Sequence, residues 1–123
     1  TVIVGPGVYE ENTSVSTHNV TLVADGITTL SAPAGANLSS LIEVRAPGVQ
    51  IRNFGFVIDY PAVANGVFGP PSQLFDGLTV DNCRFVAAGS PPTQANPSHG
   101  VHVDGAGGPM DRVFLTNNEA FST

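Results

Sequence analysis

Four polar residues have the types and the spacing needed for acid–base chemistry. His102 and Asp104 lie two residues apart in the chain, as do Glu43 and Arg45. In an extended strand, residues two apart point to the same face. A histidine beside a carboxylate can exchange protons with a substrate, and an arginine nearby can bind a substrate carboxylate. We therefore predict His102 and Asp104 as candidate catalytic residues, and Glu43 and Arg45 as candidate substrate-binding residues. The alternative is that all four are solvated residues on the outer face of a sheet.

Metal binding is a second chemistry to consider at the same place. His99, His102 and Asp104 form an H-x-x-H-x-D sequence, but this spacing matches no strong metal-site template. Within one regular strand, His99 and His102 are also expected to face opposite ways. We therefore predict no resident metal or other cofactor. Calcium stays open as an alternative, because carboxylate oxygens are its usual ligands and four aspartates are available: Asp59, Asp76, Asp81 and Asp104.

The composition limits the classes of protein to consider. The chain has 123 residues, of which 41% are apolar and 11% charged, with 14 Gly, 10 Pro and a net charge of −6. This profile is typical of many short strands joined by turns. An acidic chain without lysine is a poor match for nucleic acid or an anionic membrane. The single cysteine, Cys83, forms no disulfide framework and is predicted to be a buried packing residue.

The chain repeats itself. Four runs begin with an apolar residue after a turn and then alternate apolar and polar positions: "VTLVADG" from Val20, "VQIRNFGF" from Val49, "LTVDNCRF" from Leu78 and "VFLTNNEAF" from Val113. Their starts are 29, 29 and 35 residues apart (49 − 20, 78 − 49 and 113 − 78). Alternation with period two predicts strands with one buried face, and a fixed offset predicts stacked coils.

Two further sets of short strands accompany these runs. One set is expected upstream of each run, at residues 1–4, 41–45, 66–68 and 100–104, and a third set is expected after each run. In the upstream set, Ile42, Val44, Val101 and Val103 are expected to point inward. We also expect the phenylalanines to pack in the core and in loops: Phe54, Phe56, Phe85, Phe114 and Phe121.

An asparagine recurs at one register. Asn53, Asn82 and Asn117 each lie four residues after the first apolar residue of a run, where the chain should bend. Asparagine tolerates left-handed backbone angles, and stacked asparagine amides hydrogen-bond to one another as a ladder. A β-sandwich or a leucine-rich repeat does not predict this register. The chain is therefore predicted to be a right-handed parallel β-helix of about four coils, with three short parallel sheets and with loops at 59–74 and 88–99.

The opening segment carries a resemblance to a known superfamily. "TVIVGPGVYEENTSVSTHNVTLVADG" (1–26), with its Pro-Gly-Val-Tyr-Glu-Glu turn, resembles the opening coil of pectin methylesterases, which belong to the pectin-lyase-like β-helix proteins. Residues 41–121 resemble generic coils of that superfamily. The catalytic motifs of pectin methylesterases, polygalacturonases and pectate lyases are absent from the sequence, so no catalytic set is carried over.

The resemblance implies a carbohydrate-related function. The chain is expected to bind an acidic polysaccharide or, within a longer parent protein, to process one; an enzyme of this kind would be a lyase, hydrolase, esterase or epimerase. Whether the chain is an enzyme stays open. A secreted, extracellular or periplasmic location is expected on the same ground.

The alternative is a non-catalytic structural module that assembles with itself. Residues 1–123 are predicted to form one β-helix domain, either a fragment of a longer chain or a minimal self-stacking helix. The coil ends lack a recognisable capping helix, and uncapped solenoid ends expose strand edges and apolar core. We therefore expect end-to-end association into homo-oligomers.

Overall fold

The chain is built from strands alone in the part that the structure describes. The computed structural model describes residues 1–70, 76–89, 99–104 and 113–122, and these ranges contain fourteen strands and no helix. The strands form three sheets in which every pairing is parallel. No helix in these ranges is long and apolar enough to cross a membrane.

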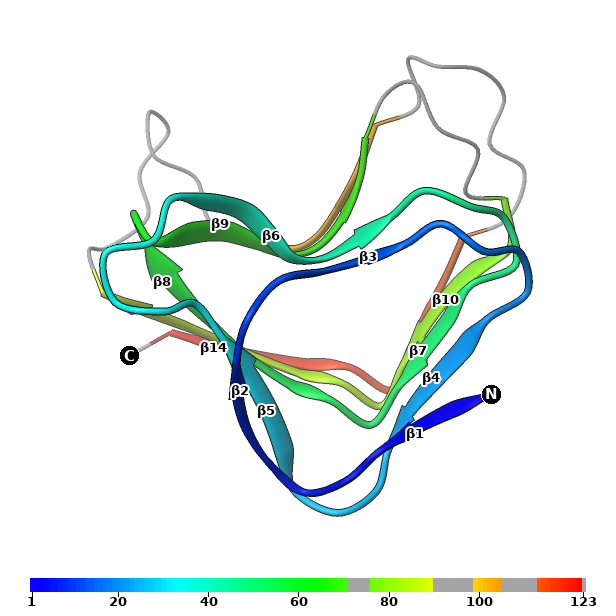
Figure 1. Cartoon of the computed structure of the whole chain (residues 1–123), viewed down its shortest axis with the longest axis horizontal. Helices are drawn as coiled ribbons and strands as arrows, with labels where there is room; N and C mark the ends of the chain where they lie inside the picture. The colour runs from blue at the N-terminus through cyan, green and yellow to red at the C-terminus, as the bar shows by residue number, and fades with distance from the viewer. Residues whose placement is uncertain (71–75, 90–98, 105–112, 123) are drawn as a thin grey trace.

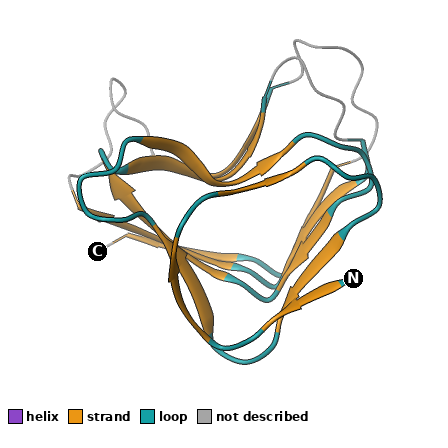
Figure 2. Ribbon diagram, viewed as in Figure 1, coloured by secondary structure: helices purple, strands orange, loops and turns teal. Residues whose placement is uncertain are grey.

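The three sheets form the sides of a coil (Figures 1 and 2). Sheet A contains β1 (Val2–Val4), β4 (Thr21–Ala24), β7 (Gln50–Arg52), β10 (Leu78–Asp81) and β13 (Val113–Thr116). Sheet B contains β2 (Gly7–Glu10), β5 (Thr28–Ser31), β8 (Gly55–Tyr60), β11 (Arg84–Gly89) and β14 (Glu119–Ser122). Sheet C contains β3 (Thr13–Val15), β6 (Leu38–Val44), β9 (Val63–Gly69) and β12 (His99–Val103).

Consecutive strands visit sheets A, B and C in turn, so the chain winds as a parallel β-helix. Four complete coils are followed by the A and B strands of a fifth. In Figure 1 the N-terminal coil is nearest the viewer and the chain turns clockwise as it recedes, which is a right-handed winding. The predicted fold is therefore confirmed. Residues 90–98, within the predicted loop 88–99, lie outside the described residues, and the predicted loop 59–74 proves to contain β9.

The register confirms the predicted offsets and corrects one assignment. Leu22 pairs with Ile51, Ile51 with Val80, and Val80 with Leu115, which reproduces the offsets of 29, 29 and 35 residues. The strand at residues 1–4 was expected in the upstream set, but Val2 pairs with Leu22 in sheet A. The first coil is only 20 residues long (22 − 2), because short turns connect β1, β2 and β3. The spacing of the later, longer coils therefore predicts the wrong sheet for residues 1–4.

The core consists of apolar side chains that repeat from coil to coil. Ile51, Val80, Phe56 and Phe85 are buried, and the rings of Phe56 and Phe85 stack with centroids 4.9 Å apart and an interplanar angle of 9°. Burying a side chain of this size contributes about 1.5–3 kcal/mol. The four inward positions predicted on sheet C are also found: Ile42 and Val44 are buried, and Val101 and Val103 are partly buried against the core.

The phenylalanine prediction holds for the middle coils and fails for the last one. Phe54, Phe56 and Phe85 are buried, whereas the side chains of Phe114 and Phe121 are 49% and 45% exposed. The difference arises because β13 and β14 are edge strands in the described structure and have no further coil beside them. Phe121 lies under the guanidinium of Arg84, at 4.7 Å from the ring centroid.

Sheet C departs from regular alternation in its middle. Three consecutive residues of β6, Ser40 to Ile42, are buried, and so are Asn65 to Val67 of β9. Gly66 makes this possible: a Cβ at Gly66 would lie 2.7 Å from the carbonyl oxygen of Gly100 and 3.0 Å from a ring carbon of Phe85. A Cβ at Gly100 would also lie 3.0 Å from that ring. The two glycines therefore let sheet C approach Phe85 directly.

Replacing Gly66 with alanine is expected to lower the free energy of unfolding by about 1–3 kcal/mol, because an added methyl group would overpack this contact. Urea denaturation followed by circular dichroism measures the change. Gly5→Ala is the matched control, since no atom lies within 4 Å of a Cβ at Gly5. Equal stability of the two variants would contradict the role given to Gly66.

Candidate functional site

The outer face of sheet C carries a row of side chains aligned along the helix axis. Ser14 pairs with Glu43, Glu43 with Phe68, and Phe68 with His102, so these four residues occupy one register on four successive strands. We call them the outer column. Neighbouring strands lie about 4.8 Å apart, so the outer column presents one side chain per coil. Ser14 is exposed, and the other three residues are partly buried.

Glu43 and Arg45, the predicted substrate-binding residues, contact each other. Arg45 Nη2 lies 2.8 Å from Glu43 Oε1, and the Ser14 hydroxyl donates to Glu43 Oε2 at 3.4 Å. The arginine side chain is 42% exposed and the glutamate side chain 16%. An ion pair this open to water contributes little to stability. The guanidinium is the more exposed partner, and its remaining N–H groups can bind an external carboxylate.

His102, the predicted acid–base residue, lies in an aromatic cluster. Its ring centroid is 5.3 Å from that of Phe68 and 4.9 Å from that of His99. Asp104 follows β12, and its backbone N–H donates to the Gly69 carbonyl at 2.9 Å. An acid–base role for His102 and Asp104 stays a prediction.

The expectation that His99 and His102 face opposite ways is wrong. Their rings are tilted by 45° and in contact, although the residues are three apart on β12. The physical reason is the irregular stretch of sheet C, where Gly66 and Gly100 lie against Phe85 and the alternation of faces is interrupted.

Asn65 is a site residue that the sequence prediction missed. It is buried, with 7% of its surface exposed, and its Nδ2 donates to the Ser39 carbonyl at 2.7 Å. Its Oδ1 therefore faces His99 Nδ1, at 3.0 Å. Because an amide oxygen only accepts hydrogen bonds, Nδ1 of His99 is the donor in this contact, which leaves Nε2 as the ring nitrogen that could bind an ion. The only hint in the sequence is an asparagine inside the apolar run "AVANGVF".

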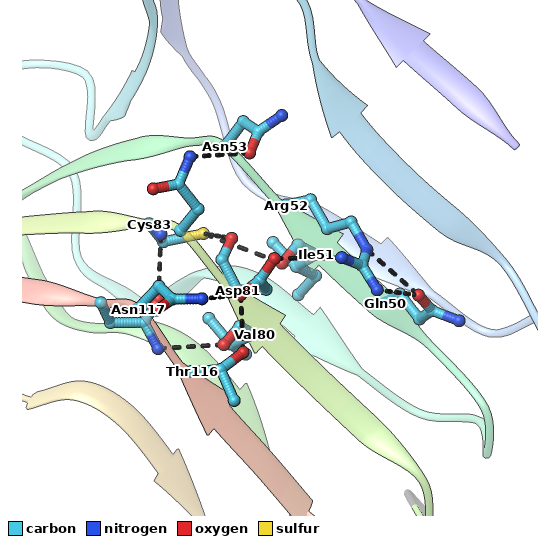
Figure 3. Close-up of polar contacts among 11 residues, drawn as sticks. Gln50, Ile51, Arg52, Asn53, Val80, Asp81, Cys83, Thr116 and Asn117 are labelled. Atoms are coloured by element: carbon cyan, nitrogen blue, oxygen red, sulfur yellow. Dashed lines mark hydrogen bonds and ion pairs between the residues drawn. The ribbon is translucent and has the colours of Figure 1, made fainter.

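The asparagine corner between sheets A and B forms a second polar cluster (Figure 3). Asn53, Asn82 and Asn117 have left-handed backbone angles, with φ of 69°, 52° and 54°. Asn82 Nδ2 donates to Asn53 Oδ1 at 3.0 Å, whereas Asn117 Nδ2 donates to Asp81 Oδ1 at 3.1 Å. A hydrogen bond between two amides therefore joins Asn53 and Asn82, whereas the amide of Asn117 donates to the carboxylate of Asp81.

Asp81 connects three coils at this corner. Its carboxylate accepts hydrogen bonds from Thr116 Oγ1 at 2.6 Å and from Asn117, and it pairs with Arg52 Nη1 at 3.0 Å. Arg52 is held in turn by Gln50 Oε1, at 2.8 Å and 3.2 Å. The hydrogen bonds from Thr116 and Asn117, together with the charge of Arg52, lower the pKa of Asp81 below its usual value. The contacts of the Asp81 carboxylate therefore hold neighbouring coils together.

Cys83 lies buried beside the corner, as predicted. Its Sγ lies 3.4 Å from the Asp81 carbonyl oxygen, and its N–H donates to Asn118 Oδ1 at 2.9 Å. Burial raises the pKa of the Cys83 thiol to about 11. A buried thiol that stays protonated is a poor nucleophile, so Cys83 acts as a packing residue here.

The described residues contain no group of three or more His, Cys, Asp or Glu side chains that could hold a metal ion. An apolar cavity of about 170 Å³ lies inside the first coils, lined mainly by Val2, Val4, Leu22, Leu30, Ile42 and Phe54. It faces the core side of the sheets, so it is separate from the outer column.

No family model, no curated protein and no solved structure matches the chain. Membership of the pectin-lyase-like superfamily therefore stays a prediction from the sequence.

Asp81→Asn is expected to lower the free energy of unfolding at neutral pH, because an amide cannot form the ion pair with Arg52. A pKa lowered in the folded state stabilises the fold above the unfolded value of 3.8, and this contribution is lost as the pH falls through the folded-state pKa. The difference in stability between wild type and variant should therefore shrink below about pH 4. Urea denaturation at several pH values measures it.

Asp25→Asn is the control for this comparison, since Asp25 is an exposed carboxylate on an earlier coil. It should leave the stability almost unchanged at all pH values. A difference between wild type and Asp81→Asn that persists undiminished in acid would contradict the role given to the Asp81 carboxylate.

Proposed function

We propose that the outer face of sheet C binds a linear acidic polysaccharide lying along the helix axis. The observation that supports this most is the outer column itself, in which one polar or aromatic side chain stands on each of four successive strands. The strand spacing of about 4.8 Å is comparable to the length of one sugar unit. A polymer of repeating units therefore meets a protein surface with a similar repeat.

Each residue in and beside the outer column has a role in this proposal. Phe68 offers a partly exposed ring for the apolar face of a sugar. Arg45 offers its guanidinium to a uronate carboxylate, in a geometry that arginine and carboxylates commonly adopt. Ser14, Glu43 and His102 offer hydrogen-bonding groups for hydroxyls. If the bound polymer is also processed, the imidazole of His102 is the candidate acid–base group in the outer column.

Arg45→Gln is expected to weaken binding of polygalacturonate about tenfold or more, because a hydrogen bond to a charged group is worth about 1.5–3 kcal/mol. Phe68→Ala is expected to weaken binding as well, because the contact between the ring and the apolar face of a sugar is lost. Isothermal titration calorimetry measures the affinity. Arg84→Gln is the matched control, since this exposed arginine lies on sheet B. A neutral glucan of the same length should bind wild type more weakly, and equal binding would overturn the uronate part of the proposal.

A second candidate function is self-assembly, and the two ends of the described helix favour it. Apolar side chains are exposed on the first strands, at Val2, Ile3 and Val8, and on the last strands, at Phe114, Leu115 and Phe121. The first and last strands of each sheet are edges whose backbone groups can pair with another strand. Head-to-tail stacking of two copies would continue sheets A and B, which end in β13 and β14, and would cover part of both sets of side chains.

Leu115→Lys is expected to abolish any concentration-dependent association, because a charge on an edge strand opposes strand addition. Sedimentation velocity over a range of concentrations measures it, with and without polygalacturonate. Ile27→Lys serves as the control, since Ile27 is 88% exposed and lies between β4 and β5. A wild-type chain that sediments as a monomer at every concentration would contradict this second function.

A further inference from the structure

We infer that His102, the last residue of the outer column, and His99 form a binding site for a borderline divalent transition-metal ion, such as Zn²⁺ or Cu²⁺. The argument for this site does not depend on the polysaccharide proposal, although His102 belongs to both. It has two protein ligands, so the remaining positions on the ion would be filled by water. Imidazole nitrogens are preferred ligands for Zn²⁺, Cu²⁺ and Ni²⁺.

The first support is the distance between the rings. A Zn–N bond is about 2.0–2.1 Å long, and the ring centroid lies about 1 Å beyond the nitrogen. Two imidazoles that share one ion at a tetrahedral angle therefore have centroids roughly 5 Å apart. The centroids of His99 and His102 are 4.9 Å apart. The separation of the two rings is therefore compatible with a shared ion.

The second support is the way in which His99 is held. Metal-binding histidines usually donate their second ring N–H to a carbonyl or carboxylate oxygen, which fixes the tautomer and the orientation of the ring. His99 Nδ1 makes this bond to Asn65 Oδ1 at 3.0 Å. Asn65 is itself buried and fixed by its bond to the Ser39 carbonyl at 2.7 Å. A buried asparagine that orients a partly exposed histidine leaves Nε2 ready to bind an ion.

The third support is the surroundings of His102. Phe68 lies on β9, the strand paired with β12, and contacts the His102 ring with centroids 5.3 Å apart. The contact limits the freedom of the His102 ring and places an apolar group beside it, as is common around metal sites. Packing between two rings alone would account for the contact, but it would not require the buried hydrogen bond behind His99.

Titration of the untagged chain with ZnCl₂ in a buffer that does not bind metals tests the inference. Isothermal titration calorimetry should show one saturable site per chain. His99→Gln and His102→Gln should each weaken it at least about tenfold. His18→Gln is the matched control, because His18 is the third histidine of the chain and is exposed on an earlier coil. It should bind Zn²⁺ as wild type does.

A second variant tests the orienting role of Asn65. Asn65→Leu keeps the branched shape of the side chain and both histidines but removes the hydrogen bond to His99, so circular dichroism should show the same fold, while the affinity for Zn²⁺ should fall about 10- to 100-fold. With Cu²⁺, electron paramagnetic resonance should show coupling to two imidazole nitrogens in wild type and to one in His102→Gln. Absence of saturable binding, or binding that survives both His99→Gln and His102→Gln, would overturn the inference.

Discussion

The rest of the structure depends on one constraint, the parallel hydrogen-bonded pairing of each coil with the coils on either side. A strand in this fold satisfies its backbone groups through its neighbours in the sheet. The pairing therefore places residues of equal register directly above one another, about 4.8 Å apart. Leu22, Ile51, Val80 and Leu115 lie in one column for this reason, although 93 residues separate the first from the last (115 − 22). Every column of side chains, apolar or polar, follows from the same pairing.

The fold could be predicted from the sequence because the pairing of coils constrains the amino-acid types along each column. Residues that must stack have the same type, so apolar pairs and asparagines recur at fixed offsets. Asn53, Asn82 and Asn117 were recognisable as corners because few residues tolerate a left-handed backbone. The first coil was harder to place, since its 20-residue length breaks the offset, and the corner positions of the first two coils are Val4 and Ala24 rather than asparagine. A periodic argument fails where the period changes.

The polar sites could be predicted only in part, because they join residues that no fixed offset connects. Glu43 and Arg45 were found from their spacing of two on one strand, and the structure shows them as an ion pair. The contact between His99 and His102 depends on the irregular stretch of sheet C, which in turn depends on Gly66 and Gly100 leaving room for Phe85. The packing of Phe85 against the inner side of sheet C does not change the sequence spacing of the residues on its outer side, so the sequence does not reveal it. Asn65 was missed for the same reason.

Charge connects the polysaccharide and metal proposals at the surface of sheet C. A chain with a net charge of −6 repels a polyuronate at long range, and in the outer column Glu43 already holds Arg45. A divalent ion on His99 and His102 would add two positive charges at the end of the outer column opposite Ser14. The uronate polymer would then meet cationic groups at both Arg45 and the ion, with Phe68 in between. Binding of the polymer would strengthen with bound metal and, by the reciprocity of linked equilibria, the polymer would strengthen binding of the metal by the same factor.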